Sequence, residues 1–270
     1  MGETIGFIGV GSQGGPMAHR IVDAGMDLVV WARRAEVLEA YTVKGGKAAA
    51  SVAELGALCD HVGICVVNDT DVLSITDQLV PVMKRGGRIA IHSTILPETV
   101  AKLEEQCDAA GLFLIDAPVS GGSPGAEAGT LTVMCGGRQE AYEAALPVFQ
   151  TFGRLIPLLG PAGAGQRAKI VNNAMLSAHM GVAQAAIEAA QALDIDRKAF
   201  IELIGASSGN SFGFGVFARL PSPAAFTTGA PMLLKDMNLL KAILPGHDGA
   251  DEIAAISARF LAAANPPKSS

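Results

Sequence analysis

A glycine-rich turn near the start of the sequence is the feature that most limits how this chain can fold. A short apolar run, Thr4 to Ile8, leads directly into Gly9-Val10-Gly11-Ser12-Gln13-Gly14, and Pro16 follows near the start of an expected helix. This G-x-G-x-x-G spacing lets the backbone turn tightly and approach a pyrophosphate, whose charge lies at the helix amino end. We therefore predict that Gly9 to Gly14 bind a dinucleotide. The alternative is a glycine turn without a ligand.

The end of the next expected strand bears on which dinucleotide is bound. Asp27 to Trp31 is the second apolar run, and Ala32, Arg33 and Arg34 follow it. Folds that prefer NAD usually place Asp or Glu there for the ribose hydroxyls, and this chain has no carboxylate at that spot. Guanidinium groups match a phosphate with forked donors, so these residues predict NADP(H) as the preferred cofactor, with NAD(H) as an alternative. The competing interpretation is a pair of solvated surface arginines.

Strand and helix patterns then alternate in the manner of βαβ units. Expected strands at 61–67 and 88–91 lead to Val67-Asn68 and to His92-Ser93-Thr94. In open parallel sheets ligands bind beyond the carboxyl ends of the strands, so Val67, Asn68 and Thr94 are expected to line the cofactor cleft. His92 could carry a proton, but a lone histidine beside a strand end is more often structural, and we favour that interpretation.

A possible anion site follows the expected strand at 113–116. Ser120, Gly121 and Gly122 offer unhindered amide N–H groups and a hydroxyl at one point. Such a group of donors suits a carboxylate or another small anion. Taken alone, the segment is better explained as an ordinary glycine-rich loop.

The stretch from Gly163 to Asn173 lies where the α/β half gives way to a helical half. It opens an apolar run, 170–187, that carries no formal charge, and Lys169 is the last charged residue before it. Residues i and i+4 share a helix face, so Lys169 and Asn173 project together, whereas Asn172 points about 100° away. A lone lysine before an apolar helix is by default a surface residue.

Further along the chain, we interpret 207–215 as a flexible connection.

Composition restricts the remaining classes of function. The 270 residues predict roughly two domains. A net charge of −6 argues against a nucleic-acid partner, and four cysteines without a CxxC pattern fit a reduced, cytoplasmic protein. The run 170–187 has membrane-spanning length but contains polar residues such as Asn172 and Gln184, so we expect a buried helix and no membrane partner. No metal is expected.

Four segments together resemble the β-hydroxyacid dehydrogenase family, which includes 3-hydroxyisobutyrate dehydrogenase, tartronate semialdehyde reductase and the glyoxylate/succinic semialdehyde reductases. They are Gly9 to Ala18, Asp116 to Gly122 with Gly129-Thr130-Leu131, Gly163 to Asn173, and Leu234-Lys235-Asp236. The resemblance implies an α/β fold, with a Rossmann-type, mostly parallel, doubly wound sheet binding NADP in 1–162. It implies that 163–270 form a long interdomain helix and an all-helical substrate and dimerisation domain, in a homodimer or homotetramer.

The resemblance also implies roles for particular residues. Lys169 would be the catalytic acid/base, and Asn173 would position the substrate. Ser120, Gly121 and Gly122 would hold the carboxylate of a small-molecule substrate. Thr94 and Lys235 would contact the cofactor near the nicotinamide, with Lys235 also facing the substrate and Asp236 beside it among the cofactor-binding residues.

These roles predict an NADP-preferring oxidoreductase that interconverts a small β-hydroxy acid and its semialdehyde or keto acid. Two alternatives stay open. An imine reductase-like enzyme typically lacks the lysine that this chain has at 169. A non-catalytic dinucleotide-binding module would need none of Ser120, Lys169, Asn173 and Lys235.

Overall fold

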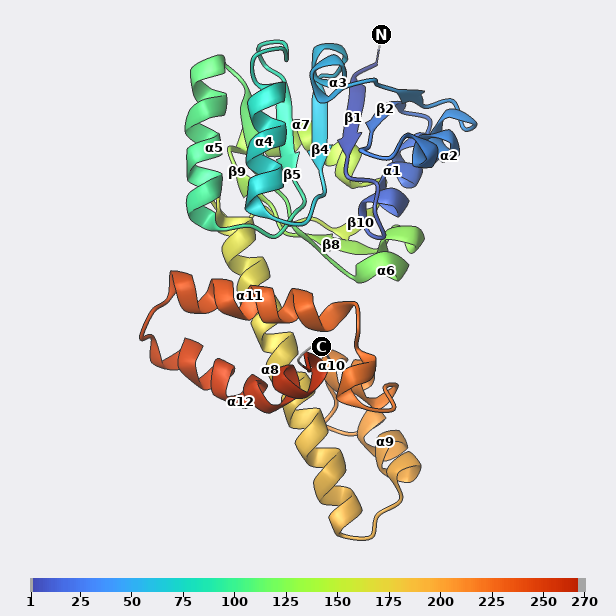
Figure 1. The fold of residues 1–270 in the computed structure, drawn as a ribbon, viewed down its shortest axis with the longest axis vertical. Coiled ribbons are helices and arrows are strands. Elements are labelled where there is room, and N and C mark those ends of the chain that lie inside the picture. Colours follow the sequence, from blue (N-terminus) through green and yellow to red (C-terminus); the bar gives the residue numbers. More distant parts are fainter. Residues whose placement is uncertain (1, 267–270) are drawn as a thin grey trace. The chain divides into compact units, whose positions relative to one another are not determined.

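The computed structural model describes residues 2–266, which form two compact units. The first unit ends at Lys169 and the second begins at Ile170, so the division lies inside the long helix α8, Ala164–Ala192. Figure 1 shows the strands gathered in the first unit and helices making up the second.

The first unit is built on a seven-stranded sheet in the order β3-β2-β1-β4-β5-β6-β9. The neighbouring pairs from β3 to β6 are parallel, and β9 pairs antiparallel with β6. Its strands are β1 Thr4–Ile8, β2 Asp27–Trp31, β3 Lys47–Ala48, β4 His61–Ile64, β5 Arg88–Ile91, β6 Phe113–Asp116 and β9 Gly136–Gly137. Strand order reverses between β1 and β4, and this reversal is the point at which such sheets bind ligands.

A second, three-stranded sheet has the order β10-β8-β7. Its strands are β7 Val119–Ser120, β8 Leu131–Val133 and β10 Gly153–Leu155. It pairs the strand that ends at Ser120 antiparallel with Thr132 and Val133. This pairing gives the segment around Ser120 a fixed place in the fold.

Helices cover both faces of the larger sheet, and each face has its own apolar core. One core contains buried residues of α1 and α7, and the other contains buried residues of α3, α4 and α5. Alternate residues of β1 enter opposite cores, as Phe7 and Ile8 do, because successive strand side chains point to opposite faces. The helices of this unit are α1 Gly14–Asp23, α2 Glu39–Thr42, α3 Val52–Leu58, α4 Asp69–Leu79, α5 Pro97–Ala110, α6 Gly122–Ala128 and α7 Gln139–Phe149, with a 3-10 turn at Ala35–Leu38.

Polar side chains cap the starts of several helices. Ser51 Oγ accepts a hydrogen bond from the Glu54 amide at 3.0 Å and so caps the start of α3. Asp196 caps helix α9, Arg197–Gly205, by accepting a hydrogen bond from the Ala199 amide at 2.8 Å. These bonds satisfy amides that the helix itself leaves without partners.

Two expectations about local structure are wrong. The strand expected at 61–67 ends at Ile64, although the Cys65 amide still donates to the Ile8 carbonyl at 2.8 Å. The stretch 207–215, expected to be a flexible connection, contains the start of helix α10, Phe212–Ala218. Ser211 begins that helix by accepting a hydrogen bond from the Phe214 amide at 3.0 Å, a capping signal that the surrounding glycines obscured.

The second unit is helical. Besides most of α8 it contains α9 Arg197–Gly205, α10, α11 Gly229–Ile243 and α12 Asp248–Ala264, with a 3-10 turn at Pro223–Ala225. Its core joins Ile170, Met180 and Ile187 of α8 to Phe217, Met237 and Phe260 of the later helices. Within residues 2–266, no helix has both the length and the apolar character needed to cross a bilayer. The expected α/β Rossmann-type fold with a helical second half is thus confirmed.

Two histidines lie in the core of the first unit. His61 on β4 is fully buried, and His92, just beyond β5, is 4% exposed. The rings of Phe149 and Phe152 pack edge-on against His92, and Phe149 packs in the same way against His61. Neither ring nitrogen of His61 has a hydrogen-bond partner among the described residues, nor does His92 Nε2. Burial lowers the pKa of His92 to about 4 and that of His61 well below its usual value.

Candidate dinucleotide and acid/base site

The turn from β1 into α1 is shaped by its glycines. Gly9 has φ +94°, and a Cβ there would lie 2.1 Å from the Cys65 carbonyl oxygen. A Cβ at Gly14 would lie 2.1 Å from the Gly9 carbonyl oxygen, so both positions exclude side chains for packing reasons. Around Gly11 the Cβ position is open, with no atom within 4 Å. The loop thus presents bare backbone at the amino end of α1, as a bound pyrophosphate requires.

A cavity of ≈ 540 Å³ lies beside this loop. Its lining comes from the end of β1, the glycine turn, the end of β2 and helix α4. Six of the residues predicted to bind the cofactor are part of that lining: Gly9, Val10, Gly11, Ala32, Arg33 and Arg34. Segments far apart in the sequence therefore meet here as the strand order requires.

Arg33 faces a carboxylate that sequence reasoning missed. Its Nη1 lies 3.9 Å from Asp71 Oδ1, and both residues line the cavity. The Arg33 side chain is 75% exposed and that of Asp71 30% exposed, so the attraction between them is screened by water. Asp71 lies in the first turn of α4, and nothing in its own sequence neighbourhood links it to the end of β2.

The other predicted cofactor residues do not line this cavity. Ser12 is exposed, and Gln13 and Gly14 form the start of α1. Val67 is 70% exposed, and Asn68 Oδ1 accepts from the Asp71 amide at 2.8 Å, which starts α4. Thr94 is half-buried between Ser93 and Ile95. Their cofactor contacts stay predictions.

The segment at Ser120 is tied to the glycine turn. Ser120 ends β7, and Gly121 and Gly122 follow with φ +131° and +62°, a conformation that favours glycine. Ser123 Oγ then donates to the Ser12 carbonyl at 2.7 Å. The predicted anion-binding segment and the predicted phosphate loop are therefore joined by a direct hydrogen bond.

The first turn of α8 is anchored by a buried carboxylate. Asp116, at the end of β6, is fully buried and accepts from the amides of Gly163 and Gln166, both at 2.7 Å. Burial raises the pKa of Asp116, and the two backbone hydrogen bonds oppose that rise. A Cβ at Gly165 would meet the Met134 carbonyl oxygen at 2.1 Å. These contacts explain why Gly165 has no side chain and how the start of the helix is fixed to the sheet.

Lys169 follows that anchored turn. It is 9% exposed, so it is not the solvated surface lysine that its sequence position suggests by default. Asn173, four residues later on the same helix, is 8% exposed. The predicted acid/base is therefore a mostly buried side chain at the carboxyl end of the first compact unit.

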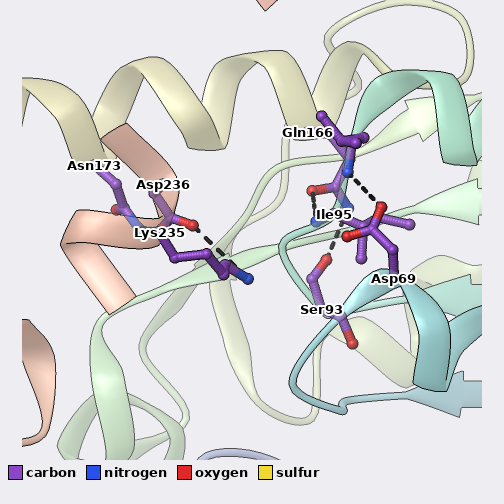
Figure 2. A network of polar contacts seen from close by, with 8 residues as sticks. Asp69, Ser93, Ile95, Gln166, Asn173, Lys235 and Asp236 are labelled. Atoms are coloured by element: carbon purple, nitrogen blue, oxygen red, sulfur yellow. Dashed lines mark hydrogen bonds and ion pairs between the residues drawn. The ribbon is translucent and has the colours of Figure 1, made fainter. Parts of the chain in front are cut away.

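The predicted residues of the helical unit form a group of their own. Asn173 Nδ2 donates to Asp236 Oδ2 at 2.5 Å, and Lys235 Nζ lies 3.9 Å from Asp236 Oδ1 (Figure 2). Asn172 Nδ2 donates to Asn173 Oδ1 at 3.1 Å, so Asn172 supports its neighbour. Asp236 is 2% exposed, whereas the Lys235 side chain is 37% exposed. The structure thus brings Asn173, Lys235 and Asp236 together.

His92 has a structural environment. Its Nδ1 lies 2.9 Å from the Ala117 carbonyl oxygen, and phenylalanine rings surround it. Because burial lowers its pKa to about 4, the neutral ring is the stable form near neutral pH. This environment agrees with the structural interpretation of His92.

Two protein-family models match the chain in succession. The model of the NAD-binding domain of 6-phosphogluconate dehydrogenase matches residues 4–160. The model described as NAD-binding of NADP-dependent 3-hydroxyisobutyrate dehydrogenase matches residues 163–267. Both descriptions support a nicotinamide dinucleotide as the cofactor.

Individual relatives agree with these models. The chain is 34% identical to the mitochondrial 3-hydroxyisobutyrate dehydrogenase of Drosophila melanogaster over 220 residues, 81% of this chain and 68% of that protein. It is 34% identical to the NAD-dependent L-serine dehydrogenase of Pseudomonas aeruginosa over 249 residues, 88% of this chain and 84% of that protein. Among solved structures, 3-hydroxyisobutyrate dehydrogenase of Mycobacterium tuberculosis with L-serine superposes with a TM-score of 0.85, at 26% identity over 97% of this chain and 94% of that one.

Proposed function

The chain belongs to the β-hydroxyacid dehydrogenase family, and we propose that it is an NAD(P)-dependent oxidoreductase that interconverts a small β-hydroxy acid and its semialdehyde or keto acid. The observation that carries the proposal is the low exposure of Lys169, a residue of the compact unit that also holds the glycine-lined cavity. A module that only binds a dinucleotide has no use for a buried amine there, because burying an amine is costly.

The residues of the first unit fit a nicotinamide dinucleotide. Bare backbone at Gly11 and the amino end of α1 would hold the pyrophosphate, and the cavity lined by Trp31 and Val37 would hold the adenosine part. When bound, such a cofactor supplies or accepts a hydride. The protein's own task is to bind and orient the two reactants and to move the proton.

Lys169 is proposed to move that proton. Reduction of a carbonyl substrate leaves negative charge on its oxygen, and an ammonium at Lys169 can donate a proton to that oxygen. In the reverse direction the neutral amine accepts the proton of the substrate hydroxyl. The burial of Lys169 keeps bulk water from competing for these transfers.

The substrate carboxylate is proposed to bind at Ser120, Gly121 and Gly122. The positive φ values of the two glycines turn successive amides at this point, and the Ser120 hydroxyl adds a further donor. For the helical unit we keep the proposal that Asn173 and Lys235 act on the substrate and that Lys235 and Asp236 contribute to cofactor binding. The hydrogen bond from Asn173 to Asp236 supports this by holding the amide in one orientation.

NADP(H) is the proposed preferred cofactor, and Arg33→Ala tests it. We expect NADPH to bind about ten- to a hundredfold more weakly, because a charge-assisted contact to the 2′-phosphate is lost, while NADH binding stays nearly unchanged. Titration of each cofactor by calorimetry measures both constants. Arg154→Ala, which removes an exposed arginine away from the cavity, is the matched control. Equal weakening for both cofactors would assign Arg33 a structural role.

A substrate panel tests the activity itself. Small β-hydroxy acids, the matching semialdehydes and keto acids, and a cyclic imine are incubated with the protein and either NADPH or NADH, and the nicotinamide absorbance is followed. We expect turnover with at least one carboxylate-bearing carbonyl compound and faster reaction with NADPH. Turnover of the imine alone, or tight NADPH binding without any turnover, would contradict the proposal.

A further inference from the structure

Gln166 makes two side-chain hydrogen bonds that bracket one residue of the first unit. The side chain is fully buried. Its Nε2 donates to the Ser93 carbonyl at 2.8 Å, and its Oε1 accepts from the Ile95 amide at 3.0 Å (Figure 2). The two contacted backbone groups belong to the peptide units on either side of Thr94.

These two bonds fix the conformation of Thr94. A peptide unit is planar, so only φ and ψ of Thr94 separate the two bonded planes. When both planes are bound to the same rigid amide, those two angles have little freedom left. The direction in which the Thr94 side chain leaves the backbone is therefore set by Gln166.

The same glutamine is fixed to the helix that carries Lys169. Its own amide donates to Asp116 Oδ2 at 2.7 Å, so the turn is held from β6 as well. Lys169 follows three residues later, and positions i and i+3 are neighbours on a helix surface. One buried side chain thus links the segment after β5 to the first turns of α8.

We propose that Gln166 is a positioning residue that sets Thr94 relative to Lys169. The proposal rests on the proposed function, in which Thr94 contacts the cofactor near the nicotinamide and Lys169 moves the proton. Hydride and proton transfer require that Thr94 and Lys169 hold their positions relative to the reactants. Displacing either group by about 1 Å can lower the rate on the order of a hundredfold. Gln166 itself contacts neither reactant in the proposed mechanism.

The Gln166 clamp, which is the pair of hydrogen bonds to the Ser93 carbonyl and the Ile95 amide, requires an amide side chain at this position. It needs one donor and one acceptor at the end of a side chain of this length, and both bonded backbone groups are buried with Ser93 and Ile95. Asparagine is one methylene shorter, and an apolar residue leaves a buried carbonyl and a buried amide without partners. A carboxyl group can replace the amide only in its protonated form, because only then does it donate.

Gln166→Glu therefore makes the clamp depend on pH. Burial favours the protonated form of the introduced carboxyl, which can donate to Ser93 and accept from Ile95. As pH rises, ionisation places negative charge against the Ser93 carbonyl. We expect kcat, as a ratio to wild type at each pH, to fall at least about tenfold across this ionisation, while KM for NADPH changes by less than about threefold.

Gln166→Met removes both bonds without adding charge. We expect kcat to fall about ten- to a hundredfold at every pH, and the deuterium isotope effect with nicotinamide-deuterated NADPH to increase, because hydride transfer becomes slower than the other steps. In the cofactor-free protein, exchange of the Ile95 amide hydrogen should accelerate in Gln166→Met. In Gln166→Glu it should stay slow, since an oxygen still accepts that hydrogen bond.

Gln184→Met is the matched control on the same helix. Gln184 is also buried, and its Nε2 donates within the helix to Glu188 Oε1 at 3.1 Å. We expect this variant to change stability without changing the isotope effect or the exchange of the Ile95 amide. If Gln166→Met fails to fold, the two pH limits of Gln166→Glu still compare the clamp intact and broken in one protein.

Different results contradict the two proposals. If wild type turns over a substrate, and Gln166→Met keeps its kcat and isotope effect although Ile95 exchange is faster, the positioning role is wrong. If the ratio of kcat for Gln166→Glu to kcat for wild type does not change with pH, the positioning role is also wrong. If wild type reduces no compound of the panel, the proposed function itself fails, and the positioning role falls with it.

Discussion

Lys169→Ala is expected to reduce turnover by about 10²–10⁴-fold while dinucleotide binding stays nearly intact. The variant removes the only group assigned to proton transfer, and it leaves the glycine turn and the cavity lining untouched. Steady-state kinetics with the best substrate of the panel, together with NADPH titration of the same sample, separates the two effects. Lys44→Ala, which removes a lysine paired with Asp23 at 2.8 Å, is the control and should turn over like wild type.

Chemical rescue makes the Lys169 experiment specific. A small primary amine such as methylamine can occupy the space of the missing side chain and carry the proton in its place. Partial recovery of turnover that increases with amine concentration supports acid/base catalysis. Near-normal turnover of Lys169→Ala without added amine would remove the proposed mechanism, whatever the variant's stability.

Acidification is expected to destabilise the first unit through its buried histidines. The folded state holds the pKa of His92 at about 4, whereas an unfolded histidine has a pKa near 6.5. The unfolded chain therefore binds more protons between these values, and stability falls as pH drops from about 6.5 to about 4. At 1.36 kcal/mol for each pKa unit, His92 alone contributes about 3 kcal/mol across that window. His61 acts in the same direction.

Exchange of amide hydrogens in β4 and β5, measured as a function of pH, reports this loss for the first unit alone. His92→Gln removes the titrating ring while keeping a donor for the Ala117 carbonyl. The pH dependence of its stability should be shallower than in wild type, even if the variant is less stable at neutral pH. Asp116 acts the other way, because its raised pKa favours folding at low pH, and its contribution is common to both proteins. Parallel pH profiles for the two proteins would show that His92 is not responsible.

Local pattern was sufficient to predict the parallel strands and the glycine turn that follows the first of them. The glycine turn after Ile8 and the arginines after Trp31 lie next to their strands in sequence, and parallel strands bring their carboxyl ends to one edge. The helix through Lys169 and Asn173 was equally plain, since an uncharged run of that length has few other folds. In each case the signal and the structure it describes occupy neighbouring residues.

Contacts between distant residues could not be predicted in this way. Gln166 bonds to Ser93 and Ile95 across more than seventy positions, and Asp116 reaches Gly163 and Gln166 across about fifty. No spacing rule relates such residues, because the intervening chain decides whether they meet. Asp71 was missed for the same reason. The residues that support a site are thus harder to find than those at its centre.

The placement of Trp31 gives the protein an internal optical probe. It is the single tryptophan of the chain and lines the cavity together with Arg33 and Arg34. Tryptophan emission overlaps the absorption of reduced nicotinamide. A reduced dinucleotide bound beside this indole would therefore quench the tryptophan fluorescence and emit nicotinamide fluorescence through energy transfer. An oxidised dinucleotide lacks that absorption band and leaves only direct quenching. If the cofactor binds in this cavity as proposed, its occupancy and redox state can be followed by fluorescence in the unlabelled protein.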